Sequence, residues 1–219
     1  MKTLESYIAE VLETYLREDV QGEFEINHLR NMKELPQIIG YVERTLGHSR
    51  IGEGQGRTVY RLQNGTVLKV AKNLGGISQN EAEATVCKSE DTSDIFPRIF
   101  ELGPNATWLI AEEAKGMTRV KFSTLTGIPW NEFQFAIGGA FPNSLDVSHQ
   151  TANLLKQYQD AFNKHYANPF LRRVINLIKD CKYEPGDIVK LDSWGVVRNK
   201  PVIIDSGFTE TVNKTHYRK

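Results

Sequence analysis

The sequence predicts an α+β fold in which a small antiparallel sheet with one inserted helix is followed by helices and a terminal β-hairpin. Three observations lead to this prediction. Apolar side chains recur at the spacing of a helix face in residues 3–18 and again in residues 147–181. The pair Asn64-Gly65 separates two short β-type runs, and Asn-Gly accepts the positive φ angles of a tight hairpin. Near the end of the chain, residues 194–197 and 201–204 form two further short apolar runs around a turn.

The composition is that of an ordinary globular protein, and it excludes several classes of function. Lys plus Arg and Asp plus Glu each number 27, so the chain has no basic bias towards nucleic acid or anionic lipid. Without a run of 18 apolar residues, no membrane span is expected, and the N-terminus reads as an amphipathic helix instead of a signal peptide. Two cysteines, Cys87 and Cys181, form no disulfide framework and fit a reducing cytoplasm. We therefore expect a cytoplasmic protein without a nucleic-acid or membrane partner.

The first half of the chain is expected to alternate between helices and short strands. A second helix is predicted near residues 30–46, where Ile38, Ile39, Val42 and Leu46 form its apolar set. Residues 57–62 and 66–71 form the two strands of the hairpin. Residues 74–77 are expected to be a loop, and a helix is expected to begin at Ser78, because Ser78 and Glu81 match a capping box.

The remaining elements are predicted from short patterns and from glycine and proline punctuation. Two more strands, at residues 96–102 and 107–111, are joined by the turn Gly103-Pro104-Asn105. Residues 116–145 are mixed in pattern and suggest short helices and loops. The helical stretch at residues 147–181 is expected to break near Asn168-Pro169, since proline cannot continue a helix from the preceding turn.

The glycine-rich stretch at residues 52–56 and the strand lysine Lys69 are candidate ligand-binding features. Three glycines at alternate positions permit a tight turn whose backbone amides can lie close to phosphates. Lys69 lies in the middle of an apolar strand, where a buried ammonium needs a partner, and Glu83 on the following helix can supply it. Lys72 is the other candidate cation, but the pleat places it on the opposite face. The alternative interpretations are a flexible hairpin and a solvated lysine on an edge strand.

Three aspartates near the end of the chain are candidates for a metal and an acceptor site. Asp205 ends the apolar run 202–204 and precedes a turn, and Asp192 precedes the partner strand of the same hairpin. Their carboxylates can therefore converge on one cation. Asp187 lies five residues before Asp192. The alternative is three separate aspartates in ordinary turns.

These motifs together resemble those of the protein-kinase-like superfamily, in particular its atypical and aminoglycoside-phosphotransferase branches. The matching segments are 52–60 (glycine-rich loop), 67–69 (lysine strand), 80–83 (glutamate helix), 107–114 (hinge strand), Gly186-Asp187 (catalytic loop) and 204–207 (Asp-x-Gly metal site). The chain departs from the family pattern at four points. Arg57 replaces the third glycine, Pro185 the catalytic-loop histidine and Asp192 the metal-binding asparagine, and only a short tail follows Gly207.

The resemblance implies a two-lobed fold and a set of roles. The expected organisation is a helical extension at 1–47, a kinase-like N-lobe with a small antiparallel sheet at 48–115, and a reduced, mainly helical C-lobe at 116–219. Lys69, Glu83 and Asp187 would be catalytic, and Asp192 and Asp205 would bind Mg²⁺ or Mn²⁺. The expected nucleotide-binding residues are Gly52, Glu53, Gly54, Gln55, Gly56, Val59, Lys69, Glu113 and Ala114.

By this resemblance the protein is expected to be an ATP-dependent phosphotransferase that passes the γ-phosphoryl group to a hydroxyl of a protein or a small molecule. Two alternatives remain open. One is a pseudokinase, a binding or regulatory module that works with or without nucleotide. The other is a nucleotidyl transferase that uses the same residues with the nucleotide reversed.

Overall fold

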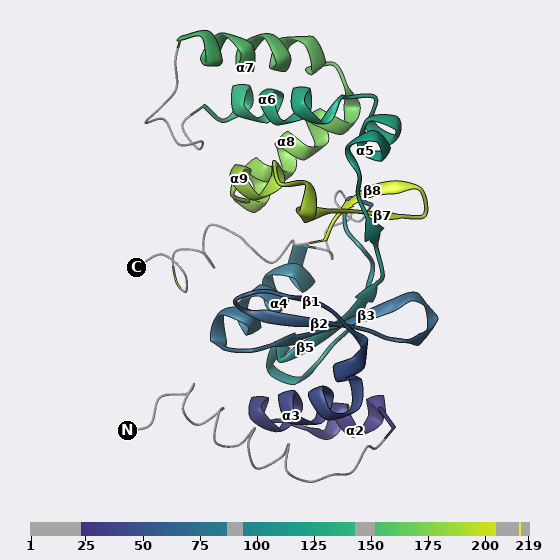
Figure 1. Ribbon diagram of the computed structural model, residues 1–219. Helices are drawn as coiled ribbons and strands as arrows, with labels where there is room; N and C mark the ends of the chain where they lie inside the picture. Colours follow the sequence, from purple (N-terminus) through teal and green to yellow (C-terminus); the bar gives the residue numbers. More distant parts are fainter. Residues whose placement is uncertain (1–22, 87–93, 143–151, 205–214, 216–219) are drawn as a thin grey trace. The chain divides into compact units, whose positions relative to one another are not determined.

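The computed structural model describes residues 23–86, 94–142, 152–204 and 215, and the chain divides into two compact units (Figure 1). The first unit contains the described residues up to 86, residues 98–113 and residue 215, and the second contains residues 94–97, 114–142 and 152–204. The predicted helix at residues 3–18 lies outside the described residues. Within the described ranges, no helix is both long enough and apolar enough to cross a membrane.

The first unit is built on a five-stranded antiparallel sheet with the order β1-β2-β3-β5-β4. Its strands are β1 (Arg50–Glu53), β2 (Arg57–Arg61), β3 (Thr66–Ala71), β4 (Ile99–Leu102) and β5 (Trp108–Glu112). The helix α4 (Leu74–Val86) connects β3 to β4. The predicted hairpins around Asn64-Gly65 and Gly103-Pro104-Asn105 are confirmed, and Asn64, Gly65 and Asn105 have φ angles of 66°, 71° and 51°.

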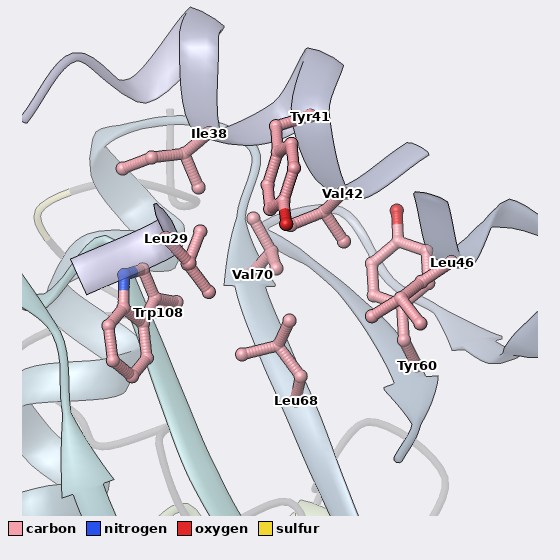
Figure 2. Packing of buried hydrophobic residues seen from close by; sticks show 9 residues of the cluster. All are labelled: Leu29, Ile38, Tyr41, Val42, Leu46, Tyr60, Leu68, Val70 and Trp108. Atoms are coloured by element: carbon pink, nitrogen blue, oxygen red, sulfur yellow. The ribbon is translucent and has the colours of Figure 1, made fainter. Parts of the chain in front are cut away.

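Two helices before the sheet, α2 (Ile26–Asn31) and α3 (Leu35–Leu46), complete the core of this unit. The prediction of a helix near 30–46 is confirmed for α3, which carries Pro36 in its first turn, where the missing N–H costs nothing. Figure 2 shows how apolar side chains from both helices meet those of the sheet. The buried cluster contains Leu29, Ile38, Tyr41, Val42, Leu46, Tyr60, Leu68, Val70 and Trp108.

The strand β3 is buried on both faces, and alternation along it separates two environments. Leu68 and Val70 belong to the cluster beneath α2 and α3. Lys69 projects from the other face, towards α4, because successive side chains of a strand alternate. The sheet therefore has an apolar face covered by α3 and a face near α4 that holds a buried lysine.

The predicted start of the inserted helix is wrong. Helix α4 begins at Leu74 instead of Ser78, so Ser78 and Glu81 lie inside the helix and form no capping box at its start. Asn73 takes the capping role, because its Oδ1 accepts a hydrogen bond of 3.0 Å from the N–H of Gly76. Gly76 is tolerated inside the helix because it packs against Gly56, where no β-carbon would fit.

The second unit is mainly helical and contains a three-stranded antiparallel sheet. Its helices are α5 (Arg119–Thr126), α6 (Trp130–Ala140), α7 (Ala152–His165), α8 (Pro169–Cys181) and the short α9 (Pro185–Ile188). The strands are β6 (Lys115–Gly116), β7 (Trp194–Val197) and β8 (Lys200–Ile203). The terminal hairpin and the break at Asn168-Pro169 are confirmed, and Asn168 caps α8 through its Oδ1.

An aromatic cluster forms the core of the second unit. Phe122, Phe133, Phe170 and Trp194 lie with their ring centroids 4.9 to 6.1 Å apart, in edge-to-face or tilted contacts. The indole N–H of Trp194 donates a hydrogen bond of 2.8 Å to the carbonyl of Ile188. This bond fastens the start of β7 to α9. The antiparallel sheet of the first unit and the helices of the second confirm the predicted α+β fold class.

Candidate functional site

The buried ion pair between Lys69 and Glu83 is the centre of the candidate site in the first unit. Lys69 lies in the middle of β3, between Val59 of β2 and Leu109 of β5. Its Nζ lies 2.6 Å from Oε1 of Glu83, and the two side chains are only 7% and 1% exposed. The contact between Lys69 and Glu83 that the sequence predicts is therefore present. Charges this deeply buried persist only when they are paired.

A second cation, Arg57, contacts the same carboxylate. Its Nη1 lies 2.6 Å from Oε2 of Glu83 and 3.3 Å from Oδ1 of Asn80. Asn80 is held in turn, because its Nδ2 donates a hydrogen bond of 2.8 Å to the carbonyl of Ala106. Sequence reasoning missed both residues. A signal for Asn80 existed, since it lies three residues before Glu83 on α4 and therefore shares its helix face.

The two cations keep Glu83 ionised. Burial raises the pKa of its carboxyl group, but the charges and hydrogen bonds of Lys69 and Arg57 outweigh that effect, and the net pKa lies below the ordinary value. Glu83 is therefore a carboxylate at neutral pH, with one oxygen directed to each cation.

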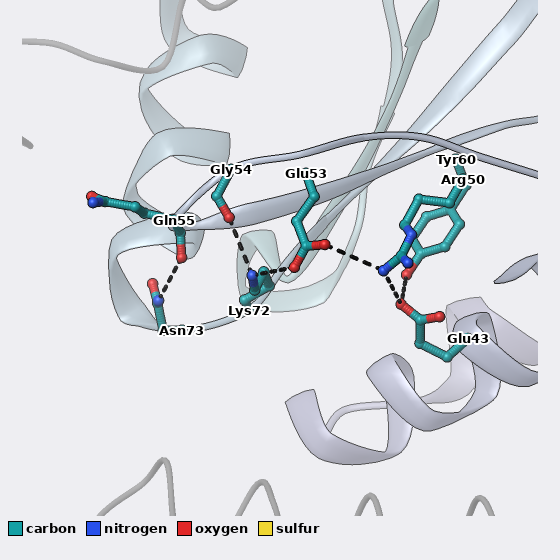
Figure 3. Close-up of polar contacts among 8 residues, drawn as sticks. All are labelled: Glu43, Arg50, Glu53, Gly54, Gln55, Tyr60, Lys72 and Asn73. Atoms are coloured by element: carbon teal, nitrogen blue, oxygen red, sulfur yellow. Dashed lines mark hydrogen bonds and ion pairs between the residues drawn. The ribbon is translucent and has the colours of Figure 1, made fainter.

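The glycine stretch forms a tight turn between β1 and β2, closed by a hydrogen bond of 2.8 Å from the N–H of Gly54 to the carbonyl of Arg57. Three of its carbonyls accept hydrogen bonds from the segment that joins β3 to α4, and Figure 3 shows the two at Gly54 and Gln55. Nζ of Lys72 donates to Gly54 at 3.2 Å, Nδ2 of Asn73 to Gln55 at 3.1 Å, and the N–H of Lys72 to Gly56 at 2.7 Å. The turn is thus fixed through its carbonyl groups.

This arrangement determines where two amide groups of the turn point. No peptide bond in the described residues is cis, and a trans peptide places its C=O and N–H on opposite sides. The N–H groups of Gln55 and Gly56 therefore point away from Lys72 and Asn73. Paired backbone amides of this kind can bind an anion.

Lys72 belongs to a chain of exposed polar contacts that differs from the buried pair at Lys69. Its Nζ lies 2.6 Å from Oε1 of Glu53, and Oε2 of Glu53 lies 3.3 Å from Nη1 of Arg50 (Figure 3). Nη1 of Arg50 lies 4.0 Å from Oε1 of Glu43 on α3. The same Glu43 oxygen accepts a hydrogen bond from the hydroxyl of Tyr60. The hydrogen bond to Lys72 lowers the pKa of Glu53. Lys72 therefore holds the turn, and it is not the buried cation.

The expected hinge is the end of β5 and the residues that follow it. The N–H of Glu113 donates a hydrogen bond of 2.8 Å to the carbonyl of Gly65, and its carboxylate pairs with Arg61 at 2.7 Å. Both groups are thus engaged within the first unit. Ala114 is the first residue of the second unit after β5, and its methyl group lies close to Gly195, where a β-carbon would approach it to 2.7 Å.

The candidate aspartates belong to the second unit or lie outside the described residues. Asp187 is part of α9, and its Oδ1 lies 2.5 Å from Nζ of Lys190. Asp192 lies on the turn Leu191–Ser193 before β7 and is exposed. Asp205 lies outside the described residues. Among the residues that the structure describes, no group of three or more His, Cys, Asp or Glu side chains could hold a metal ion.

Comparisons with known proteins give a weak structural likeness and no match of sequence. No protein-family model matches the chain, and no curated protein matches it. Among solved structures, the chain is similar to APH(2")-IIa in its ternary complex with streptomycin and ATP, with a TM-score of 0.34 and 14% sequence identity. The match covers 94% of this chain and 72% of that one. A TM-score of this size does not assign the chain to a fold family.

Proposed function

We propose that this protein is an ATP-dependent phosphotransferase that transfers the γ-phosphoryl group to a hydroxyl group of a protein or a small molecule. The observation that carries the proposal is the buried Lys69–Glu83 pair in the unit that also carries the fixed glycine turn. A buried, fully compensated lysine on a central strand is costly to maintain, and phosphate binding gives it a function.

The chemistry of phosphoryl transfer matches what these residues can supply. The reaction asks the protein mainly to position groups and to neutralise charge on the phosphates. Lys69, oriented by Glu83, would contact the α- and β-phosphates, and the amides of Gln55 and Gly56 would contact phosphate oxygens. Val59 would lie beneath the nucleotide, and the backbone near Glu113 and Ala114 would receive the adenine. Because the amide of Glu113 is already bonded, Ala114 is the better candidate for donating to adenine.

The acceptor side of the reaction would rest on the aspartates. Asp187 would accept the proton of the acceptor hydroxyl or orient it, with Lys190 holding its carboxylate. Asp192 and Asp205 would hold Mg²⁺ or Mn²⁺. The exposed carboxylate of Asp192 offers the oxygen ligand that these ions prefer. Such an ion supplies neutralisation of the charge on the β- and γ-phosphate oxygens.

Binding of Mg-ATP is the first test. A ligand that binds only the native state must raise the melting temperature, so about 1 mM Mg-ATP is expected to stabilise the wild-type protein. A melting temperature unchanged by Mg-ATP and by Mn-ATP would refute nucleotide binding and with it the proposed function.

Labelled nucleotide then separates the three classes of function. Incubation with γ-labelled or α-labelled ATP, alone and with cell lysate or a metabolite panel, is expected to transfer the γ-label. Transfer of the α-label would identify a nucleotidyl transferase. Tight binding without transfer of either label would identify a pseudokinase.

A further inference from the structure

We propose that Arg57 is a positioning residue that locks Glu83, and through it Lys69, in the arrangement needed to bind the phosphates of a nucleotide. This inference rests on the proposed function. It assigns a role to the residue that replaces the third glycine of the kinase-like pattern. Compared with glycine, an arginine at that position restricts the backbone conformations of the loop, so its presence needs a compensating function.

Two cations hold the carboxylate of Glu83. Each oxygen has its own cation, with Lys69 on Oε1 and Arg57 on Oε2, both at 2.6 Å. Charge-assisted hydrogen bonds of this length are the strong ones in proteins. With Lys69 alone, the carboxylate could rotate about its last side-chain bond, and α4 could shift with it. Two cations on two oxygens remove that freedom.

Arg57 itself is buried and has a second contact on α4. The guanidinium also contacts Asn80, one turn before Glu83 on the same helix, and Asn80 is fixed to the carbonyl of Ala106. Arg57 is only 6% exposed, and Asn80 is fully buried. Arg57 therefore holds α4 at two points on successive turns, and the helix is tied to the β4–β5 connection as well.

Arg57 also connects α4 to the glycine turn. The carbonyl of Arg57 closes the turn by accepting from Gly54, while its side chain reaches Glu83. The residue before it, Gly56, packs directly on Gly76 of α4. The turn, α4 and the Lys69–Glu83 pair are thereby held as one unit before any nucleotide binds. A lysine held in this way should favour ligands with phosphates over ligands without them.

The test compares how Arg57→Gln affects the binding of ATP, ADP and adenosine, measured by calorimetry. Loss of the positioning role is expected to weaken the binding of ATP and ADP about tenfold and to leave the affinity for adenosine unchanged. A change of this size is typical of coupling between contacting residues. Arg57→Lys should recover part of the lost affinity, because it restores a cation but not both contacts of the guanidinium. Arg61→Gln is the matched control, since Arg61 lies on the same strand and its side chain is 58% exposed.

The exchange of α4 backbone amides with solvent provides a second measurement that needs no ligand. In Arg57→Gln these amides should exchange faster than in the wild type, and in Arg61→Gln they should not. Arg57→Lys gives the same comparison if Arg57→Gln does not fold.

The outcomes separate this inference from the proposed function. Equal weakening of ATP and adenosine in Arg57→Gln would show a role in folding only, and unchanged ATP affinity would show no role, so either result overturns the inference alone. A wild-type protein that binds neither ATP nor adenosine overturns the proposed function, and the positioning role with it.

Discussion

Gly76 of α4 lies against Gly56 of the glycine turn so closely that a β-carbon on Gly76 would be 1.9 Å from the carbonyl oxygen of Gly56. The atom in the way belongs to the backbone, so it cannot move aside as the end of a flexible side chain could. This contact explains why the first turn of α4 carries glycine at position 76, although glycine is unfavourable inside a helix. It also means that Gly56, one of the glycines of the turn, is in direct contact with α4.

Replacement of Gly76 by alanine should destabilise the first unit. We expect a loss of about 1–3 kcal/mol in the free energy of unfolding, as for other overpacked sites. Denaturant unfolding followed by circular dichroism measures it. Gly116→Ala is the control, because a β-carbon there meets no atom within 4 Å, and its effect should stay within about 0.5 kcal/mol. Equal stability of the two variants would show that Gly56 and Gly76 are not in contact.

Lys69 and Lys72 should differ in their effect on nucleotide binding. Lys69→Ala is expected to abolish the rise in melting temperature caused by Mg-ATP, because under the proposed function this buried cation contacts the phosphates. The variant should still fold, since Arg57 remains on Glu83. Lys72→Ala should keep most of the rise, because Lys72 contacts the turn at Glu53 and Gly54. The opposite result would assign the phosphate contact to Lys72.

The buried carboxylate of Glu83 should make stability depend on acidic pH. Its pKa is lower in the folded protein than in the unfolded chain, so its contribution to stability is complete above the ordinary value of 4.5 and is lost as the pH falls through the folded pKa. At neutral pH, Glu83→Gln should cost about 3 kcal/mol, as when a buried pair loses one partner. This difference between the variant and the wild type should shrink as the pH is lowered below 4.5.

Denaturant unfolding at a series of pH values measures this dependence. Glu81→Gln is the control, because Glu81 lies on the same helix and is exposed. A difference between Glu83→Gln and the wild type that stays constant down to the lowest pH would contradict the assignment of a buried, paired carboxylate.

Variants at Asp187 and Asp205 should separate the loss of phosphoryl transfer from the loss of metal binding. Asp187→Asn is expected to remove turnover and to leave Mg-ATP affinity nearly intact, because a group that acts on the acceptor hydroxyl does not bind the nucleotide. Asp205→Asn should weaken metal binding and activity together, since under the proposed function Asp205 is a charged ligand of the metal ion. Transfer of the γ-label and the Mg²⁺ dependence of ATP binding measure the two effects. Equal loss of ATP binding in both variants would contradict these roles.

Local sequence signals predicted most of the described secondary structure. Asn64-Gly65 and Asn168-Pro169 act through backbone conformations that few other residues share, so their turn and helix break could be placed from sequence. The start of α4 could not be placed correctly from the sequence. Ser78 and Glu81 form a valid local capping motif, but Asn73 caps the helix one turn earlier, where Gly76 can pack on the glycine turn. That packing joins Gly56 and Gly76, which are 20 positions apart, so no local sequence pattern indicates it.

The candidate site was predictable where chemistry required a partner within reach. A lysine inside an apolar strand needs a carboxylate, and Glu83 lies 14 residues further along the chain, on the next element. Arg57 gave no such signal, because its partners lie on a helix 23 and 26 residues away and its position suggested a loop. The roles of Asp187, Asp192 and Asp205 stay predictions, since Asp205 lies outside the described residues.

The positions of the tryptophans give each unit its own optical reporter. Trp108 is buried in the apolar cluster of the first unit, and its indole nitrogen has no hydrogen-bond partner within the described ranges. Trp130 and Trp194 lie in the aromatic cluster of the second unit, where the indole of Trp194 donates to Ile188. A Trp108→Phe variant keeps only Trp130 and Trp194, so its tryptophan fluorescence reports the second unit alone. Indole emission moves to shorter wavelengths in apolar surroundings, so the wavelength of each signal reports the burial of its tryptophan. The difference between the spectra of this variant and of the wild type then isolates the fluorescence of the unit that carries Lys69.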